Sequence, residues 1–184
     1  MSDEEQISAI KFTCDVVKGR IPVVAGTGSN NTAHAMELSI EAEKVGADGL
    51  LLVSPYYNKA TQNGLKAHFK SIANAVKIPS ILYNVPSRTG MNIAPATIVD
   101  LCKNVDNIVA VKEASGNFSN LQKTRNLCPD DFYIWSGNDD QVVPLMSLGA
   151  KGLGELTSNL YADDPKMPPI YRKISQPGLI TLFH

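Results

Sequence analysis

A lysine ends one of the most apolar segments of the sequence. The run 108–111 reads Ile-Val-Ala-Val and is followed directly by Lys112 and Glu113. Lysine is seldom fully buried without a partner, so two explanations are open. In the first, Glu113 or another carboxylate pairs with the ammonium group and the lysine is structural. In the second, burial lowers the pKa of the amine, which then attacks a carbonyl carbon and forms a Schiff base.

Tyrosines and an arginine follow two other apolar runs. Tyr56 and Tyr57 come after the run 49–53, Tyr83 ends the run 79–83, and Arg88 lies in a loop bounded by proline and glycine. A phenol can pass a proton to a hydrogen-bonded partner, and a guanidinium suits a carboxylate. Paired loop tyrosines are more often packing or interface residues, and a loop arginine can form a surface ion pair. Taken with Lys112, however, the set fits Schiff-base chemistry on an acidic substrate without a metal.

Two other segments that follow apolar runs can be explained without a catalytic or binding role. The segment Gly26-Thr27-Gly28 lacks the third glycine of a dinucleotide-binding loop, so we interpret it as a turn that leads into a capped helix. Asp139 and Asp140 could bind a cation, but two carboxylates that open a helix are explained by capping and by the helix dipole.

The spacing of the apolar runs predicts an α/β fold. The centres of the first five runs are 24 to 30 residues apart, which leaves room for one helix between strands. The runs are nearly all apolar rather than alternating, as in parallel strands that are covered on both faces. A doubly wound sheet and a (β/α)₈ barrel both fit, and both place function at the carboxyl ends of the strands. The six predicted strands are 21–25, 49–53, 79–83, 108–112, 132–136 and 151–156.

Composition excludes several classes of protein. The 184 residues carry 17 Lys and Arg against 18 Asp and Glu, which argues against a generic nucleic-acid binder. No apolar run approaches the length of a membrane-spanning helix, and the acidic start does not resemble a signal peptide. Three cysteines without metal-ligand spacing and only three histidines argue against a metal site. We therefore expect a cytoplasmic protein with reduced cysteines that binds neither membrane nor nucleic acid.

Four ordered motifs resemble one known family. The segments IPVVAGTGSN, VSPYYNK, ILYNVPSRTG and VAVKEASGN are similar to dihydrodipicolinate synthase, a pyruvate-dependent class I aldolase related to N-acetylneuraminate lyase. The similarity covers about residues 3–161. It implies a (β/α)₈ TIM barrel, assembly as a homotetramer built from a dimer of dimers, and no metal or nucleotide cofactor.

The resemblance also implies roles for individual residues. Lys112 would form the Schiff base with pyruvate, and Tyr83 would donate and accept protons beside it. Tyr57 would join a proton relay that reaches the site of a neighbouring subunit. Arg88 would bind the carboxylate of aspartate semialdehyde. The implied reaction condenses the two substrates to 4-hydroxy-tetrahydrodipicolinate, which leads to diaminopimelate and lysine.

The sequence departs from the family at both ends. The family's first two strands and their Gly-Thr-Thr-Gly-Glu motif precede the region that matches here. Gly154 stands where the family has a residue whose backbone helps hold pyruvate. Eight βα units need roughly 220 residues, so we predict a partial barrel of about six units over 1–161, with impaired turnover. The tail 162–184 contains Pro165, Pro168, Pro169 and Pro177 and is predicted to be irregular.

This sequence matches the family's regulatory lysine site only in part. Lysine-inhibited members use residues that correspond to Asn30 and Tyr56, together with an acidic residue where this chain has His34. We therefore expect weak or absent lysine feedback, which a lysine titration would test.

Two alternative functions stay open from the sequence. The first is a related aldolase acting on sialic acid or a keto-deoxy sugar acid, which should not need Arg88. The second is a non-catalytic fragment or degenerate paralogue.

Overall fold

The computed structural model describes residues 1–153 and 180–182. Each of the six predicted strands corresponds to a strand, with small shifts at the ends that the structure describes. Residues 154–156 of the last predicted strand are outside the described residues. Gly154, and the part of the predicted tail outside 180–182, lie outside the described residues. The strands are β1 (Val23–Gly26), β2 (Gly49–Val53), β3 (Ser80–Asn84), β4 (Ile108–Glu113), β5 (Tyr133–Ser136), β6 (Gly152–Leu153) and β7 (Ile180–Leu182).

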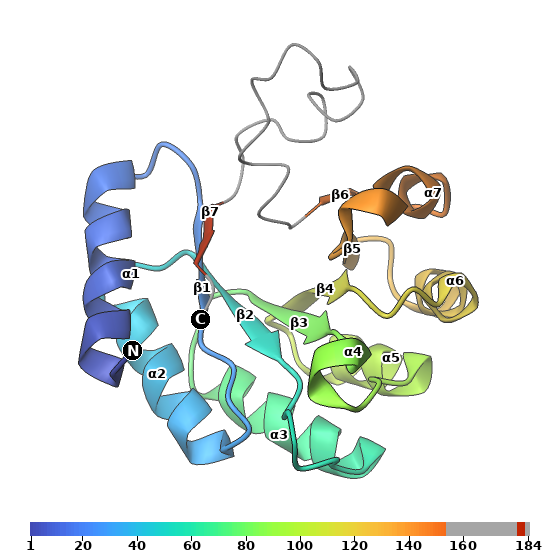
Figure 1. The fold of residues 1–184 in the computed structure, drawn as a ribbon, viewed down its shortest axis with the longest axis horizontal. Helices are drawn as coiled ribbons and strands as arrows, with labels where there is room; N and C mark the ends of the chain where they lie inside the picture. The colour runs from blue at the N-terminus through green and yellow to red at the C-terminus, as the bar shows by residue number, and fades with distance from the viewer. Residues whose placement is uncertain (154–179, 183–184) are drawn as a thin grey trace.

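The strands form one curled sheet in which every neighbouring pair is parallel. Their order is β6-β5-β4-β3-β2-β1-β7. The helices lie along the outer side of the curve, as Figure 1 shows. A doubly wound sheet would carry helices on both faces, so this arrangement decides for the barrel. The described residues therefore make up part of a (β/α)₈ barrel wall, as predicted.

Helices connect the strands, and short polar side chains begin several of them. Ser2 and Glu5 form a capping box on the first helix. Asn31 caps α2, as its side chain accepts hydrogen bonds from the backbone N–H groups of Ala33 and His34. The helices are α1 (Asp3–Val17), α2 (Thr32–Lys44), α3 (Gln62–Asn74), α4 (Pro86–Thr89), α5 (Pro95–Asn104), α6 (Phe118–Leu127) and α7 (Val142–Ser147), with a 3₁₀ turn, η1 (Asp139–Gln141), before α7.

Asn138, rather than Asp139 or Asp140, occupies the N-cap position at the start of the last of these helical segments. Asn138 precedes η1, but its side chain makes no capping hydrogen bond and instead donates to Oε1 of Gln141 at 3.2 Å. Asp139 and Asp140 do lie in the first turn of η1, where carboxylates interact favourably with the helix dipole. Sequence spacing alone could not show that the helix starts with a separate 3₁₀ turn.

A tail segment pairs with the edge of the sheet. Strand β7 lies parallel to β1, with Val23, Val24 and Ala25 aligned to Ile180, Thr181 and Leu182. The prediction of an irregular tail is therefore wrong for these three residues. The segment is rich in residues that favour strands, and an edge strand offers N–H and C=O groups for pairing.

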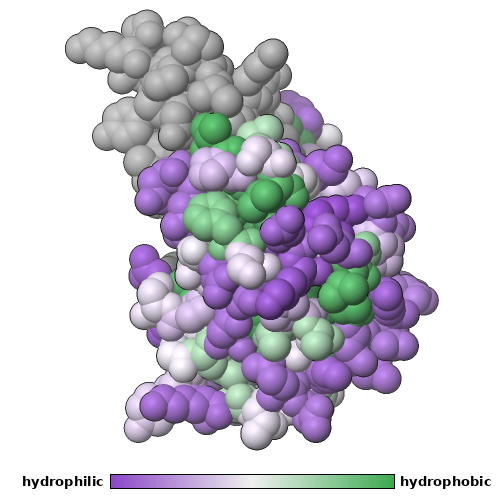
Figure 2. Space-filling view, turned by 90° about the vertical axis from the view of Figure 1, so that its right-hand side faces the viewer, coloured by the Kyte–Doolittle hydropathy of each residue, from purple (hydrophilic) through white to green (hydrophobic). Residues whose placement is uncertain are grey.

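The core lies between the sheet and its outer helices. Leu50, Leu52 and Leu82 of the strands are fully buried with Leu65 and Phe69 of α3. The outward surface around α6 and α7 is mostly hydrophilic with separate apolar patches (Figure 2). The helices thus bury apolar side chains toward the sheet and present mainly polar ones outward. None of the described helices is long and apolar enough to cross a membrane.

One buried histidine makes the stability of this core sensitive to pH. His68 of α3 is 6% exposed, its Nδ1 lies 2.8 Å from the Thr32 hydroxyl, and its ring packs edge-on against Phe69. Burial lowers the pKa of His68 to about 4. The unfolded chain takes up this proton near pH 6.5, whereas the folded chain does so only near pH 4. Stability from the neutral ring is therefore complete above pH 6.5 and is lost as the pH falls.

We predict that the free energy of unfolding falls by about 2 kcal/mol between pH 7 and pH 5 because of His68 alone. His68→Gln should remove this component, as measured by denaturant unfolding at the two pH values. His34→Gln, a change at a more exposed histidine, serves as the control and should keep it. An unchanged pH dependence in His68→Gln would contradict the assignment.

Candidate functional site

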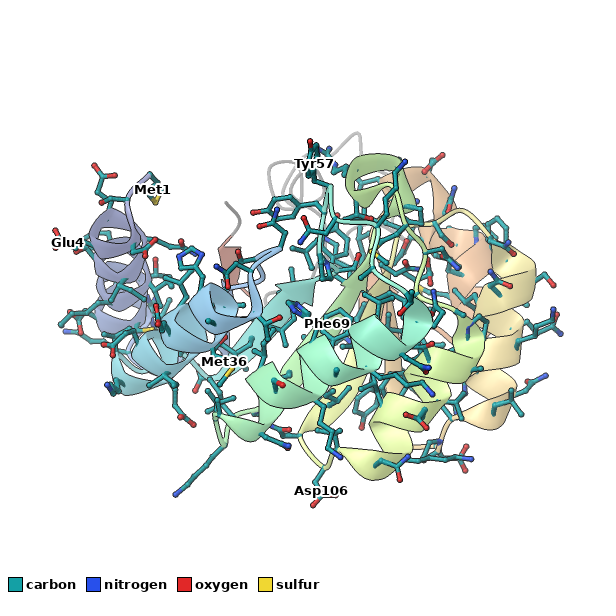
Figure 3. All side chains as sticks on the ribbon, turned by 90° about the horizontal axis from the view of Figure 1, so that it is seen from below. Met1, Glu4, Met36, Tyr57, Phe69 and Asp106 are labelled. Carbon is teal, nitrogen blue, oxygen red and sulfur yellow. The ribbon has the colours of Figure 1, made fainter. Side chains whose placement is uncertain are left out.

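A cavity of about 820 Å³ opens at the carboxyl ends of the strands. Figure 3 shows the two ends of the wall, with Tyr57 after β2 at the carboxyl end and Asp106 before β4 at the amino end. Residues from five successive strand ends line the cavity. They include Gly26, Gly28, Tyr56, Tyr83, Ser87, Arg88, Lys112, Gly137, Asn138, Asp139 and Asp140.

Lys112 and Tyr83 form the centre of this cavity. They are aligned neighbours on β4 and β3, and side chains at aligned positions of parallel strands point to the same face. The Lys112 Nζ atom lies 4.4 Å from the centroid of the Tyr83 ring, within the range of a cation–π contact. Lys112 is 3% exposed. The geometry therefore places a buried amine against a phenol at the cavity wall.

The adjacent positions carry a second pair on the opposite face of the sheet. Asn84 and Glu113 are aligned, and the Asn84 amide donates to both Glu113 carboxylate oxygens at 3.0 and 3.1 Å. The Ser115 backbone N–H donates to the same carboxylate at 2.7 Å. Burial raises the pKa of Glu113, and the hydrogen bonds from Ser115 and Asn84 oppose this shift. Since successive strand residues face opposite ways, Glu113 points away from Lys112 and anchors β4 to β3.

Arg88 lies at the exposed rim of the cavity. It belongs to α4, a single turn that starts at Pro86 and is followed by the C-cap residue Gly90, whose φ is 73°. The Thr89 hydroxyl fixes this turn by donating to the carbonyl groups of Val85 and Met91. The guanidinium is thus presented to solvent at the mouth of the cavity that contains Lys112, where it can bind an anionic group.

The two tyrosines after β2 are placed differently from each other. Tyr56, which the resemblance assigns to regulation, lines the cavity. Tyr57, which it assigns to the proton relay, is 89% exposed, and it is not among the residues that line the cavity of its own chain. Its φ of 71° is unusual for a residue with a side chain. The loop is tied to its neighbour because the Asn58 amide donates to the Asn30 carbonyl at 2.8 Å.

Two glycines are required by close packing in and beside the cavity. A Cβ atom on Gly28 would lie 2.4 Å from the Val53 backbone nitrogen, and one on Gly137 would lie 2.8 Å from Ala114 Cβ and 3.1 Å from Lys112 Cε. Gly137 therefore leaves the space that the lysine stem occupies. Sequence reasoning missed this role, although a glycine directly after a strand was a visible signal. It also missed that Asp139 and Asp140 line the cavity.

His34, which stands where lysine-inhibited members have a carboxylate, lies beside Asp3. The Nε2 atom of His34 lies 3.0 and 3.1 Å from the carboxylate oxygens of Asp3, and its Nδ1 atom lies 3.3 Å from the Ser29 hydroxyl. The carboxylate of Asp3 in α1, which is distant in sequence, thus lies next to His34. The expectation of weak lysine feedback stays a prediction.

Within residues 1–153 and 180–182, no group of three or more His, Cys, Asp or Glu side chains is placed to hold a metal ion. The cavity instead combines an amine, a phenol and a guanidinium. An amine beside a phenol can form and hydrolyse an imine with a carbonyl compound, and the guanidinium at the rim suits a carboxylate on that compound.

Comparison with known proteins gives one consistent result. A model of the dihydrodipicolinate synthetase family matches residues 1–176. A 4-hydroxy-tetrahydrodipicolinate synthase from Clostridium novyi is 55% identical over 161 residues, which are 88% of this chain and 54% of that protein. The chain therefore spans about half the length of the curated relatives it matches.

Solved structures agree with this result. The 4-hydroxy-tetrahydrodipicolinate synthase of Methylacidiphilum fumariolicum superposes with a TM-score of 0.86 at 45% identity, over 88% of this chain and 54% of that one. A dihydrodipicolinate synthase from Acinetobacter baumannii, solved in complex with pyruvate, gives 0.85 at 39% identity, over 95% and 64%. Sequence, fold and cavity agree, and the chain belongs to the dihydrodipicolinate synthetase family.

Proposed function

We propose that this chain carries the Schiff-base site of a lyase that condenses pyruvate with aspartate semialdehyde to 4-hydroxy-tetrahydrodipicolinate. The observation that carries the proposal is the buried Lys112 amine packed on the Tyr83 ring inside the cavity. The pyruvate complex of the related protein from Acinetobacter baumannii supports pyruvate as the first substrate.

The proposed chemistry needs only groups of the protein and its substrates. The Lys112 amine adds to the ketone of pyruvate and water leaves, which gives an iminium. This iminium withdraws electrons, so a methyl proton is lost and the resulting enamine attacks the aldehyde carbon of the second substrate. Tyr83 moves the protons of these steps, Arg88 binds the second substrate's carboxylate, and the backbone of Gly154 helps to hold pyruvate. Because the iminium is the electron sink, neither a metal nor a nucleotide cofactor is required.

The assembly and location belong to the same proposal. We expect a homotetramer arranged as a dimer of dimers in the cytoplasm, acting in lysine and diaminopimelate synthesis. The exposure and unusual backbone of Tyr57 support a role across a subunit interface, where it would join the neighbouring proton relay. Asn30, His34 and Tyr56 are proposed as the regulatory residues.

The 184-residue chain should turn over slowly because part of the family's substrate-binding motif is absent from it. It spans about half the length of its curated relatives, and its 184 residues contain no Gly-Thr-Thr-Gly-Glu segment. Catalysis depends on close placement of every group that holds the substrate. We therefore expect the 184-residue chain to form the pyruvate adduct but to show little steady-state turnover. Residues 1–161 would then form a partial barrel domain that carries the catalytic residues.

We predict that pyruvate forms a covalent adduct with Lys112. Incubation with pyruvate and borohydride should modify Lys112, and peptide mass mapping should locate the modification there. Lys112→Gln should abolish it, whereas Lys151→Gln, at an exposed lysine, should leave it unchanged. A modification at another lysine, with Lys112 unmodified, would sink the proposal.

We predict that filling the space between Gly137 and Lys112 slows formation of the adduct. Gly137→Ala places a methyl group 3.1 Å from Lys112 Cε and should displace the amine. We expect adduct formation to slow by about tenfold or more, since reaction rates depend strongly on placement. Gly64→Ala in α3, where the added methyl group meets Thr61 Oγ1 at 3.4 Å, is the matched control. Thermal melting separates displacement from unfolding, and an unaltered adduct rate in folded Gly137→Ala would refute the positioning role.

The third prediction separates this function from that of a sugar-acid aldolase. Arg88→Ala should leave the pyruvate adduct intact but slow its single-turnover reaction with aspartate semialdehyde by about tenfold or more, through loss of a charged hydrogen bond. Arg20→Ala, a change at an exposed arginine before β1, is the control. If Arg88→Ala reacts at the normal rate, or if only sugar aldehydes consume the adduct, the alternative aldolase is favoured.

A further inference from the structure

Two cysteines that the proposed reaction does not use lie side by side on the outer layer of the barrel wall. Cys102 belongs to α5, and Cys128 is the C-cap residue that directly follows α6. Their Sγ atoms are 3.4 Å apart, with the Cys102 thiol placed to donate to the Cys128 sulfur. The helices that carry them are neighbours in Figure 1, on the side of the sheet away from the cavity.

We propose that Cys102 and Cys128 form a reversible disulfide under oxidising conditions. A disulfide needs an S–S distance near 2 Å, so the two sulfur atoms must approach by little more than 1 Å. Cys128 is part of the buried core, and Cys102 packs against that core. Small side-chain rotations can therefore close the bond while α5 and α6 stay packed. This proposal is independent of the proposed enzymatic function.

The two thiols have different access to an oxidant. Cys102 is partly exposed, whereas Cys128 is 8% exposed. Burial, followed by the neighbouring Cys102 thiol, raises the pKa of Cys128 to about 12. Burial also raises the pKa of Cys102, although its contact with Cys128 opposes the shift. Both residues are therefore thiols at neutral pH, and the more accessible Cys102 should react first, with Cys128 completing the bond.

The diazene diamide can serve as the two-electron oxidant. The Cys102 sulfur adds to one nitrogen of the N=N bond, and the other nitrogen takes a proton. The Cys128 sulfur then attacks the Cys102 sulfur, the S–N bond breaks, and the leaving nitrogen takes the second proton. The two thiols lose two electrons in total, and the diazene becomes a hydrazine. In a reducing cytoplasm the pair would stay as thiols and would be oxidised only under stress.

The cross-link would enclose the strand that carries Lys112. Cys102 and Cys128 are 26 positions apart, and all of β4 lies between them. The bond would tie the helix before β4 to the end of the helix after it. Since closing a loop of this size constrains the unfolded chain, the oxidised protein should unfold at a temperature several degrees higher than the reduced one.

The test is oxidation of the folded 184-residue chain with diamide at mildly alkaline pH, followed by alkylation of free thiols and tryptic mapping without reductant. The three cysteines fall in separate tryptic peptides, 12–18, 89–103 and 126–151. We expect a cross-link between the last two and alkylated Cys14. An unfolded chain would favour this pair over Cys14–Cys102 by only about sixfold from loop length. An excess above about a hundredfold therefore requires the folded arrangement.

Thermal melting provides the second readout. Wild type and Cys14→Ser should gain several degrees on oxidation and lose the gain on reduction. Cys102→Ser and Cys128→Ser should show no oxidation-dependent shift. Mapping of the wild-type chain decides the proposal even if a variant fails to fold. Stable single-cysteine oxidation, mixed pairs that include Cys14, cross-links between chains, or a lower melting temperature after oxidation would each overturn it.

Discussion

The structure depends on keeping a lysine amine out of water at the end of a parallel strand. Lys112 is almost fully buried, and burial of such a group is tolerated only when its surroundings compensate for the lost hydration. The Tyr83 ring provides one such contact, since a cation is attracted to the face of an aromatic ring. The contact exists because β3 and β4 are aligned so that these residues are neighbours on one face. Any shift of this register by one residue would turn one side chain out of the cavity.

The rest of the sheet preserves that register. Immediately beyond Tyr83 and Lys112, the hydrogen bonds between Asn84 and Glu113 connect the same two strands on the opposite face. On the other side of β4, Gly137 leaves room for the lysine stem, and a methyl group there would press on it. The hydrophobic core between sheet and helices carries these strands, while α4 holds Arg88 at the cavity mouth. The proposed chemistry thus depends on neighbouring strand ends and on the short loops that follow them.

Much of this arrangement could be predicted from the sequence because its signals are local. Apolar runs such as Gly49–Val53 predicted the strands. The residues at or just after the ends of these runs predicted that Tyr83, Arg88 and Lys112 lie at one end of the sheet. Contacts between distant segments could not be predicted this way. They include the Asn84–Glu113 pair, the approach of Asp3 to His34, and the pairing of β7 with β1. Gly137 was visible in sequence, but its role requires knowing where the Lys112 stem lies.

We propose that Lys112, held against Tyr83, is the group that captures pyruvate. A crystal structure of the chain soaked with pyruvate tests this most directly. We predict continuous electron density from Lys112 Nζ to the ketone carbon of pyruvate, with the Tyr83 ring beside the new bond and the strand register unchanged. Pyruvate bound elsewhere, or a Lys112 side chain turned out of the cavity with no bond to pyruvate, would show that Lys112 is not the group that captures pyruvate.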